Sequence, residues 1–334
     1  MSTKLLIAGN PLPYHVGGHF FQAAKSLKLA VQIQDTRGAM AAPRLIQSIF
    51  WRLDRRPVGL GRYGHFLLEK CTKEKPDILL AIGQAPIETK ILAALGDMRI
   101  KRLVFLTDDP WNPAHYARWF HKALLAYDAV FSPRTANIND LLAVHGPPVI
   151  YLPFAYNPEA HFLESTLPTN ALDASDILFV GGADQDRVPW IEALLEAGIK
   201  PSLYGSYWEK YRKTRDYSYG HADLATIRRI VPSARINLCL VRRANRDGHV
   251  MRTFEIPAMG GGMLTEDTEE HRKLLGEEGE STLYFRSPQE MVEKAQWLLK
   301  HPAERDRLRQ AIYVRITQGT HTYRDRLQTI LDLS

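Results

Sequence analysis

Short apolar runs separated by amphipathic stretches recur along the chain, and this alternation constrains the fold more than any other feature of the sequence. Most of the runs lack alternating polar residues, which is typical of strands that helices cover on both faces. Successive strand–helix–strand units build a parallel sheet. The strands predicted in the first half of the chain are residues 5–8, 31–33, 78–82, 103–106, 129–131 and 149–152.

The pattern stops near residue 153 and restarts further along the chain. Pro153 and Pro158 interrupt regular structure, and a polar stretch follows to Ser175. Prolines so close together indicate a loop, which we interpret as the crossing between two domains. The strands predicted after this crossing are residues 177–180, 202–205, 236–240, 262–265 and 282–285.

We therefore predict an α/β protein of two Rossmann-like domains, each with a doubly wound parallel sheet. The N-terminal domain comprises residues 1–153 and the C-terminal domain residues 154–317. Two amphipathic helices are expected between residues 302 and 333, and the segment 318–334 is expected to pack back on the N-terminal domain. Ligands of such sheets bind beyond the carboxyl ends of the strands, so the expected site is a central cleft that both domains face.

The composition excludes several classes of protein. The chain has 334 residues, 45% of them apolar, and a formal net charge of +6, which excludes a disordered chain. The two cysteines, Cys71 and Cys239, cannot form a disulfide framework, so we expect a reducing, cytoplasmic location. The N-terminal apolar run is too short for a signal peptide, and no apolar run approaches the ~20 residues of a membrane span.

The stretch 245–262, which follows a predicted strand, carries the most informative pattern. A turn at Gly248 that leads into a helix near Val250 would present free backbone N–H groups to an anion such as phosphate. Asp247 precedes this helix and Glu255 lies two turns into it, within reach of a diol. The residues alone leave a second interpretation open, an ordinary helix capped by Asp247 with Glu255 on its solvated face.

The spacing Asp247-x7-Glu255, followed by Ala-Met-Gly-Gly-Gly at 258–262, resembles the acidic-x7-acidic signature of retaining GT-B glycosyltransferases. The GT-B fold consists of two Rossmann-like domains that face a central cleft. More closely, residues 245–265 resemble the glycosyltransferase-like domain of the spore-coat CgeB group, of the glycosyl transferases group 1 type. The first acid of the wider group is usually Glu, and Asp247 has a shorter side chain. The resemblance extends over residues 175–330 and includes the segments 231–238, 301–305 and 321–327.

The resemblance implies roles for individual residues. Glu255 would hydrogen-bond the ribose hydroxyls of a nucleotide sugar, and Asp247, as a catalytic residue, would hold hydroxyls of the donor sugar. The backbone at Gly248, His249 and Val250 would face the diphosphate. These roles fit the chemistry, because carboxylates accept hydroxyl hydrogens in short, charge-assisted bonds.

Further donor contacts are expected from two arginines and two tyrosines. Arg252 and Arg187 are candidates to neutralise the departing diphosphate, because the guanidinium group binds phosphate through two parallel hydrogen bonds. Each of them is also compatible with a surface salt bridge. Tyr204 and Tyr219, at strand ends of the C-terminal domain, are candidates to hold the base by stacking, with core packing as the alternative.

In the N-terminal half, Gly17 and Gly18 follow the first predicted strand and precede a helix expected to start near residue 20. Gly-Gly loops of GT-B enzymes face the donor phosphates from the opposite domain, and the resemblance implies that role here; the alternative is a plain turn. The neighbouring His15 and His19 are candidates for acceptor binding, or else polar surface residues. The absence of Gly-x-Gly-x-x-Gly argues against a nicotinamide dinucleotide site.

Asp108 and Asp109 stand at the end of the predicted strand 103–106. Acids at a strand end are well placed for chemistry in a cleft. Asp108 is the candidate catalytic residue that orients or deprotonates the acceptor hydroxyl, and Asp109 is a further acceptor-binding candidate. The alternative is a helix N-cap with Pro110 in the first turn.

The basic, aromatic stretch 44–62 is different in character, since it suits contact with a membrane surface or an acidic acceptor. The alternative is an amphipathic helix that covers the sheet. We expect no metal, because no cysteine or histidine pairs have ligand spacing, and no cofactor besides the donor. We expect no nucleic-acid partner, because the sequence has no dispersed basic and aromatic stripe.

These observations predict a glycosyltransferase that moves a sugar from a nucleoside-diphosphate sugar to a hydroxyl of an unknown acceptor (a glycan, a small molecule or a protein). Transfer would proceed with retention at the anomeric carbon and without a metal. The N-terminal domain would bind the acceptor and the C-terminal domain the donor. Two alternatives stay open: a non-catalytic GT-B-like nucleotide-binding protein, and a sugar-nucleotide epimerase of the same fold.

Overall fold

The computed structural model describes residues 3–164 and 175–333 and divides them into two compact units. Unit 1 contains the described residues up to Pro153, the short segment Ala244–Arg246, and the C-terminal residues from Tyr323 onward. Unit 2 contains the remaining described residues between Phe154 and Thr322. Part of the polar stretch that we predicted as a domain crossing, residues 165–174, lies outside the described residues.

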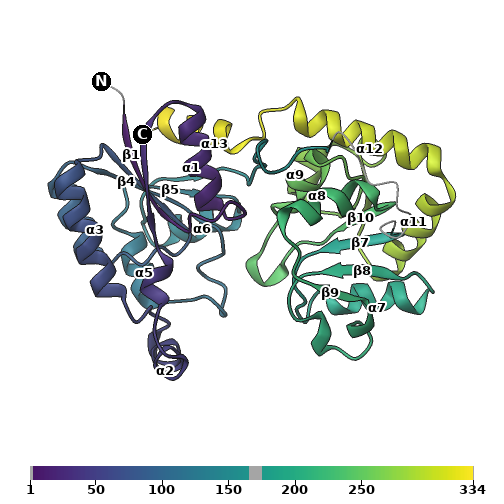
Figure 1. Cartoon of the computed structure of the whole chain (residues 1–334), viewed down its shortest axis with the longest axis horizontal. Helices are drawn as coiled ribbons and strands as arrows, with labels where there is room; N and C mark the ends of the chain where they lie inside the picture. Colours follow the sequence, from purple (N-terminus) through teal and green to yellow (C-terminus); the bar gives the residue numbers. More distant parts are fainter. Residues whose placement is uncertain (1–2, 165–174, 334) are drawn as a thin grey trace. The chain divides into compact units, whose positions relative to one another are not determined.

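Unit 1 is built on a six-stranded parallel sheet with the strand order β2-β1-β3-β4-β5-β6 (Figure 1). Its strands are β1 (Lys4–Gly9), β2 (Ala30–Asp35), β3 (Ile78–Ile82), β4 (Lys101–Phe105), β5 (Ala129–Ser132) and β6 (Val149–Tyr151). Its helices are α1 (Val16–Ser26), α2 (Arg44–Asp54), α3 (Leu60–Glu74), α4 (Thr89–Asp97), α5 (Arg118–Leu124), α6 (Ala136–Ala143) and α13 (Tyr323–Asp332).

Side chains leave the strands of unit 1 alternately to two apolar layers. Leu6 and Val104 belong to the layer that α3, α4 and α5 complete. Phe105, the next residue along β4, instead meets Phe20 of α1, whose ring also lies 5.1 Å from that of Tyr323 at the start of α13. Because both faces are covered, the strands read as unbroken apolar runs.

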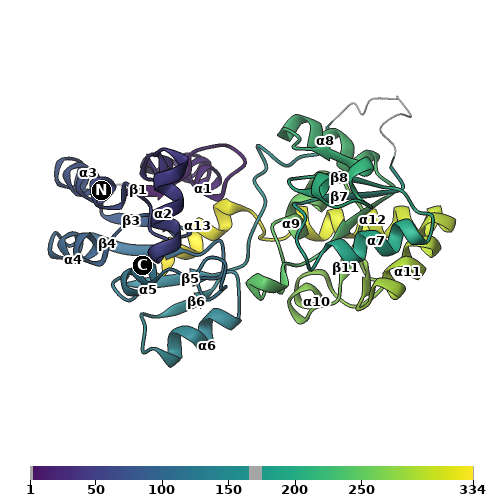
Figure 2. The same ribbon diagram turned by 90° about the horizontal axis from the view of Figure 1, so that it is seen from below.

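Unit 2 repeats this architecture with the strand order β12-β11-β10-β7-β8-β9 (Figures 1 and 2). Its strands are β7 (Ile177–Val180), β8 (Pro201–Tyr204), β9 (Ser218–Gly220), β10 (Ile236–Cys239), β11 (Met263–Glu266) and β12 (Leu283–Phe285). Its helices are α7 (Val188–Glu196), α8 (Leu224–Ser233), α9 (Arg252–Ala258), α10 (Glu269–Leu275), α11 (Pro288–Lys300) and α12 (Pro302–Thr317). Helices α7 and α11 pack on one face of the sheet.

The predicted α/β class with two Rossmann-like parallel sheets is confirmed. Each of the eleven predicted strands is present within two residues of its expected bounds, and two terminal helices are present as expected. The edge strand β9 was missed, because a three-residue strand that pairs only with β8 has too little apolar pattern to be recognised. The central cleft expected between the domains stays a prediction. Among the described helices, none combines the length and apolar content needed to cross a bilayer.

Helix α1 corrects the sequence analysis at Gly17 and Gly18. The helix begins at Val16 rather than near residue 20, so both glycines lie in its first turn and not in a loop. A Cβ atom on Gly17 would lie 2.6 Å from the carbonyl oxygen of Asn10, and one on Gly18 would overlap that of Leu12. Close packing of the helix against the preceding loop therefore requires glycine at both positions.

This packing predicts that Gly18→Ala destabilises unit 1 by about 1–3 kcal/mol, the usual cost of forcing an extra carbon into a filled space. Gly38→Ala is the matched control, because no atom lies within 4 Å of the Cβ that it would add. We expect it to change the free energy of unfolding by less than about 0.5 kcal/mol. Urea unfolding followed by circular dichroism measures both changes, and equal midpoints would contradict the packing argument.

Candidate functional site

The sheet of unit 2 changes winding direction between β7 and β10. From β7 the chain proceeds to β8 and β9 on one side, whereas β10, β11 and β12 extend the sheet on the other. Ligands of doubly wound sheets bind beyond the carboxyl ends of the strands at such a switch point. The loops that follow β7 and β10 carry Arg187 and the 245–262 motif, so the strand order brings the predicted donor residues of unit 2 to one place.

Two arginines connect the ends of these neighbouring strands. Arg252 is the first residue of α9, and its Nε donates to the carbonyl oxygen of Val180 at the end of β7 (3.3 Å). Arg187 precedes α7, and its Nη2 donates to the carbonyl oxygen of Leu240 just after β10 (3.4 Å). Two guanidinium groups, which can bind phosphate through parallel hydrogen bonds, therefore lie together at the switch point.

Arg187 is only 7% exposed, so it is not a surface residue, although its Nη1 lies 3.7 Å from Oδ2 of the more exposed Asp184, in the ion pair that the alternative expected. Burial lowers the pKa of its guanidinium group, while the carboxylates of Asp184 and Asp247 act in the opposite direction. Its Nη1 donates to the carbonyl oxygen of Gly182 over 3.3 Å, and its Nε has no hydrogen-bond partner among the described residues. Arg187 is therefore a buried cation with an unused donor.

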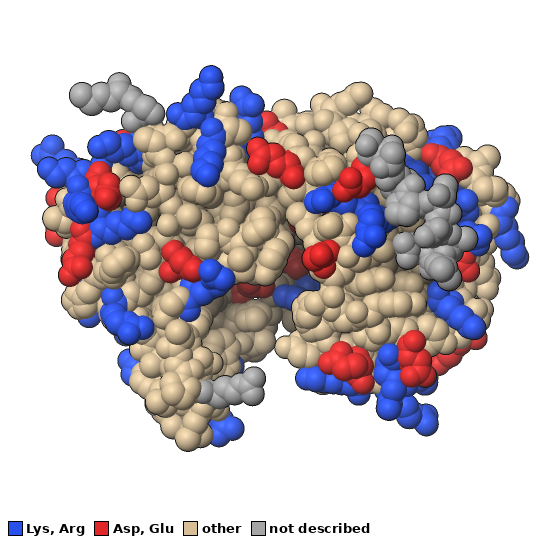
Figure 3. Space-filling view, viewed as in Figure 1, with Lys and Arg blue, Asp and Glu red and all other residues tan. Residues whose placement is uncertain are grey.

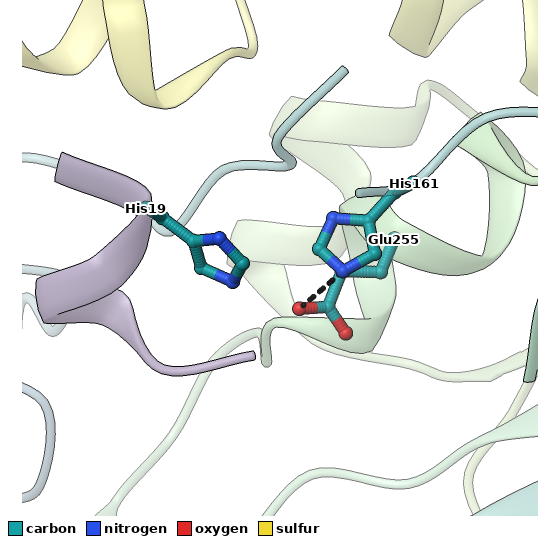
Figure 4. A group of neighbouring side chains, drawn as sticks. All are labelled: His19, His161 and Glu255. Atoms are coloured by element: carbon teal, nitrogen blue, oxygen red, sulfur yellow. Dashed lines mark ion pairs between the residues drawn. The ribbon is translucent and has the colours of Figure 1, made fainter. Parts of the chain in front are cut away.

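Glu255 is 1% exposed, which excludes the alternative of a solvated helix face. Its carboxylate forms an ion pair with Arg252, and its Oε1 lies 3.6 Å from Nε2 of His161 (Figure 4). The Nδ1 atom of His161 accepts a hydrogen bond from the backbone N–H of Asn157 (3.1 Å), so the proton of the neutral ring is on Nε2, facing Glu255. His161 was missed because it stands in a loop and belongs to no motif.

The start of α9 differs from the prediction. The helix begins at Arg252, not near Val250, so Glu255 lies in its first turn rather than two turns into it. The N-cap is Met251, and Asp247, which is half-buried, does not cap the helix. At seven residues α9 is short, so its N-terminus alone does not make an anion site, and the positive charge at this place comes from the arginines.

Residues 248–250 are held in place by α10. His249 is buried, its Nδ1 lies 2.6 Å from Oε2 of Glu270, and its Nε2 accepts from the backbone N–H of Phe154 (3.1 Å). A Cβ atom on Gly248 would overlap the Glu270 carboxylate. The backbone N–H of Val250 donates to Oγ1 of Thr253 (3.2 Å), so it is already used and is not a free diphosphate donor as predicted.

A second buried histidine, His271, connects α9 to the end of β11. The Nδ1 of His271 lies 2.8 Å from the carbonyl oxygen of Glu266, and its Nε2 lies 2.9 Å from Oγ1 of Thr253. Since a carbonyl only accepts, Nδ1 carries the proton and Nε2 accepts from the threonine hydroxyl. Burial lowers the pKa of His271 to about 4.

The two tyrosines proposed to hold the base stack on each other, with ring centroids 5.0 Å apart and planes inclined by 13°. Tyr204 ends β8 and Tyr219 lies in β9. Because Tyr219 is 63% exposed, core packing does not explain it. Their contact with a base stays a prediction.

The candidates of unit 1 divide into two groups. Asp109 is fully buried and accepts from Nε and Nη2 of Arg246 (2.6 and 2.9 Å) and from Nδ2 of Asn137 (2.9 Å). Burial raises the pKa of Asp109, but the hydrogen bonds from Arg246, Trp111 and Asn137, together with the charge of Arg246, outweigh it and the net shift is downward. Asp109 is thus a structural residue, and we withdraw it as an acceptor candidate. Asp108 is half-buried and accepts from Nδ2 of Asn245 (3.1 Å).

The N-cap alternative for this pair of acids is also wrong. Residues 109–116 form turns rather than a helix, and Oδ1 of Asp109 accepts from the backbone N–H of Trp111 (3.0 Å).

Of the two histidines proposed to bind the acceptor, His15 is exposed at the N-cap of α1, whereas His19 is buried and stacks on Tyr323 with centroids 4.9 Å apart. His19 is therefore not a surface residue.

The buried His271 predicts an acid-sensitive unit 2. In the unfolded chain this ring takes up a proton near pH 6.5, but in the fold only near pH 4. The unfolded state therefore binds the proton first as the pH falls, and the free energy of unfolding decreases from pH 6.5 to about 4, by on the order of 3 kcal/mol. Urea unfolding should show that the stability difference between wild type and His271→Gln narrows over this range. His65→Gln, at an exposed position on α3, is the control, and an unchanged difference for His271→Gln would refute this assignment.

Comparisons with known proteins agree with this architecture. Residues 187–332 match a family model described as "Glycosyl transferase-like". A search of curated proteins found no match. The structure is similar to sucrose-phosphate synthase from Thermosynechococcus elongatus, with a TM-score of 0.69, 10% identity, and coverage of 99% of this chain and 98% of that chain.

Two further solved structures share the fold. HepE of Anabaena in complex with UDP-glucose aligns with a TM-score of 0.68, 11% identity, and coverage of 98% of both chains. UDP-GlcNAc 2-epimerase from Neisseria meningitidis, bound to UDP-GlcNAc, aligns with a TM-score of 0.52, 14% identity, and coverage of 99% of this chain and all of that chain. The chain therefore has the GT-B fold, and its residues 187–332 match a glycosyltransferase-like family.

Proposed function

We propose that the protein is a glycosyltransferase that moves a sugar from a nucleoside-diphosphate sugar to a hydroxyl of a glycan, a small molecule or a protein. One observation carries the proposal: within the family-matched segment, the buried carboxylate of Glu255 lies beside Arg252 at the switch point of the unit 2 sheet. The buried Arg187, one residue before α7, supplies a second cation there.

In this proposal each donor residue has a chemical task. Glu255 accepts hydrogen bonds from the ribose hydroxyls, and Asp247 holds hydroxyls of the transferred sugar. Arg187 and Arg252 stabilise the negative charge that develops on the leaving diphosphate, which is how a site without a metal lowers the barrier. Anabaena HepE, which shares the fold, forms a complex with UDP-glucose, so a uridine nucleotide is the first donor to test.

The finer assignments belong to the same proposal. Retention at the anomeric carbon and membership of the CgeB-like group rest on the Asp247-x7-Glu255 resemblance. Asp108, half-buried at the end of β4, remains the candidate to orient or deprotonate the acceptor hydroxyl, with unit 1 as the acceptor domain. We also propose that the reaction needs no metal and that the protein is cytoplasmic.

A thermal-shift experiment tests the donor site. At a concentration about 100 times the dissociation constant, UDP or UDP-glucose should stabilise the wild-type fold by about 2.7 kcal/mol, a shift of a few degrees in Tm. Glu255→Gln should lose most of this shift, because the neutral amide neither accepts as strongly from a diol nor pairs with Arg252. Each variant is compared with its own Tm without ligand.

Glu269→Gln is the matched control, because the Glu269 side chain is 82% exposed and pairs only with a surface lysine in the described structure. It should retain the full shift. If Glu255→Gln also retains it, Glu255 does not bind the nucleotide. If no nucleoside diphosphate or its sugar shifts the wild type, the proposed donor class is wrong.

A sugar-nucleotide epimerase is the second candidate, because solved structures named UDP-N-acetylglucosamine 2-epimerase share the fold with TM-scores of 0.55 and 0.52. The two reactions differ in whether an acceptor is consumed. NMR of UDP-GlcNAc incubated with the protein alone would show inversion at C2 for an epimerase. UDP release that depends on an added hydroxyl acceptor would support the transferase, and binding without either reaction would support a non-catalytic nucleotide-binding protein.

A further inference from the structure

Helix α2 (Arg44–Asp54) differs from the other helices of unit 1 in having no buried side chain at its described positions, residues 45–54. By contrast, α3 buries five residues. Figure 1 shows α2 projecting from unit 1 beyond its sheet. An isolated helix of about this length is only marginally stable in water, so α2 lacks the packing that ordinarily stabilises a short helix.

The exposed side chains of α2 are large and apolar. Leu45 is 75% exposed, Leu53 73% and Ile49 50%, and Trp51 is also exposed. In Figure 3 the surface over α2, at the lower end of unit 1, is mostly without charged groups. Apolar surface on this scale costs free energy in water, and contiguous exposed patches usually mark a surface that binds something.

Positive charge surrounds this apolar surface. Between residues 38 and 68 the sequence has five arginines and a single acid, Asp54. Arg52 and Arg62 are exposed, and Arg56 lies 5.1 Å from the centre of the Phe50 ring. The side chain of Asp54 pairs with Arg56 at 3.6 Å, which leaves the surroundings of α2 with a net positive charge.

The helix is positioned at its C-terminal end rather than loosely attached. Arg55 donates through Nη1 to the backbone carbonyl oxygens of Pro113 and Tyr116, the latter over 3.1 Å. Beside α2 lies a cavity of about 310 Å³, whose lining is mostly apolar and includes Arg56; its lining residues are Met40, Gln47, Ser48, Trp51, Arg56, Pro57 and Val58. An apolar cavity with a cation beside it matches a molecule that has a hydrocarbon part and an anionic part.

We propose that α2 and its flanking residues dock the protein on a bilayer surface that contains anionic lipids. Leu45, Ile49 and Leu53 enter the boundary of the acyl chains, while Arg52 and Arg56 remain at the level of the phosphates. This is the arrangement of interfacial helices, whose arginines keep their charge in the headgroup layer while the apolar face inserts.

The charge distribution favours a membrane over other occupants. In a symmetric pair of copies the same patch faces itself, so the arginines of the two α2 segments would repel one another. A highly charged acidic polymer would satisfy the arginines but leave Leu45 and Leu53 in water. An anionic bilayer satisfies both groups at once. The proposal does not depend on the glycosyltransferase assignment.

Co-sedimentation with vesicles, in the absence of nucleotide, tests the proposal. The wild type should bind vesicles of phosphatidylcholine with 30 mol% phosphatidylglycerol, and should bind at least 10-fold more weakly to pure phosphatidylcholine or in 0.5 M NaCl, about where the Debye length falls to a few ångströms. The double variant L45E/I49E should lose at least 10-fold in partitioning. Both positions are exposed, so the fold should persist, as circular dichroism can verify.

Leu142→Glu is the matched control, since Leu142 is 66% exposed on α6 of the same unit. It should bind as the wild type does. R52Q/R56Q should reduce the preference for anionic over neutral vesicles. Equal binding by L45E/I49E and the wild type, or no binding of the wild type, would overturn the proposal. So would a wild-type dimer that L45E/I49E dissociates, because the apolar face would then be an interface between copies.

Discussion

A carboxylate that is removed from water must be paired, and this requirement organises the candidate donor site. Glu255 is almost completely buried, and an unpaired charge there would cost several kcal/mol. Arg252 and His161 supply the pairing, one from the first turn of α9 and the other from the loop after residue 158. The start of α9 and that loop therefore hold each other in place, and Glu255 joins two segments of unit 2 that are far apart in sequence.

The two buried histidines make this arrangement rigid. His249 links the turn before α9 to Glu270, and His271 links Thr253 of α9 to the end of β11. Each ring uses one nitrogen as donor and the other as acceptor, so neither has a nitrogen left for a ligand. Their role is to position α9. Donor binding by the motif around them stays a prediction, and the Val250 N–H, expected to face the diphosphate, is instead bonded to Thr253.

The sequence predicted those features that depend on local pattern. Apolar runs without alternation identified every strand except β9, and the spacing of Asp247 and Glu255 identified the motif. The sequence could not show that Arg187 is buried or that His161 reaches Glu255, because both facts depend on the strand order, which brings distant loops together. Gly17 and Gly18 show the same limit, since the glycines that a loop needs look the same as those that a closely packed helix start needs.

Arg187 is the residue whose role depends most on contacts that the sequence does not reveal. Its hydrogen bonds to carbonyl oxygens are 3.3 and 3.4 Å long, at the weak end of the usual range, and its Nε has no partner among the described residues. Apart from an ion pair with Asp184 at 3.7 Å, this buried guanidinium group has only weak partners to replace the hydration that it has lost, and a bound anion would add to them. In the proposed function, this incompletely bonded guanidinium group would bind the leaving diphosphate. Arg246 in unit 1 is the contrast, because its Nε donates to Oδ2 of Asp109 over only 2.6 Å.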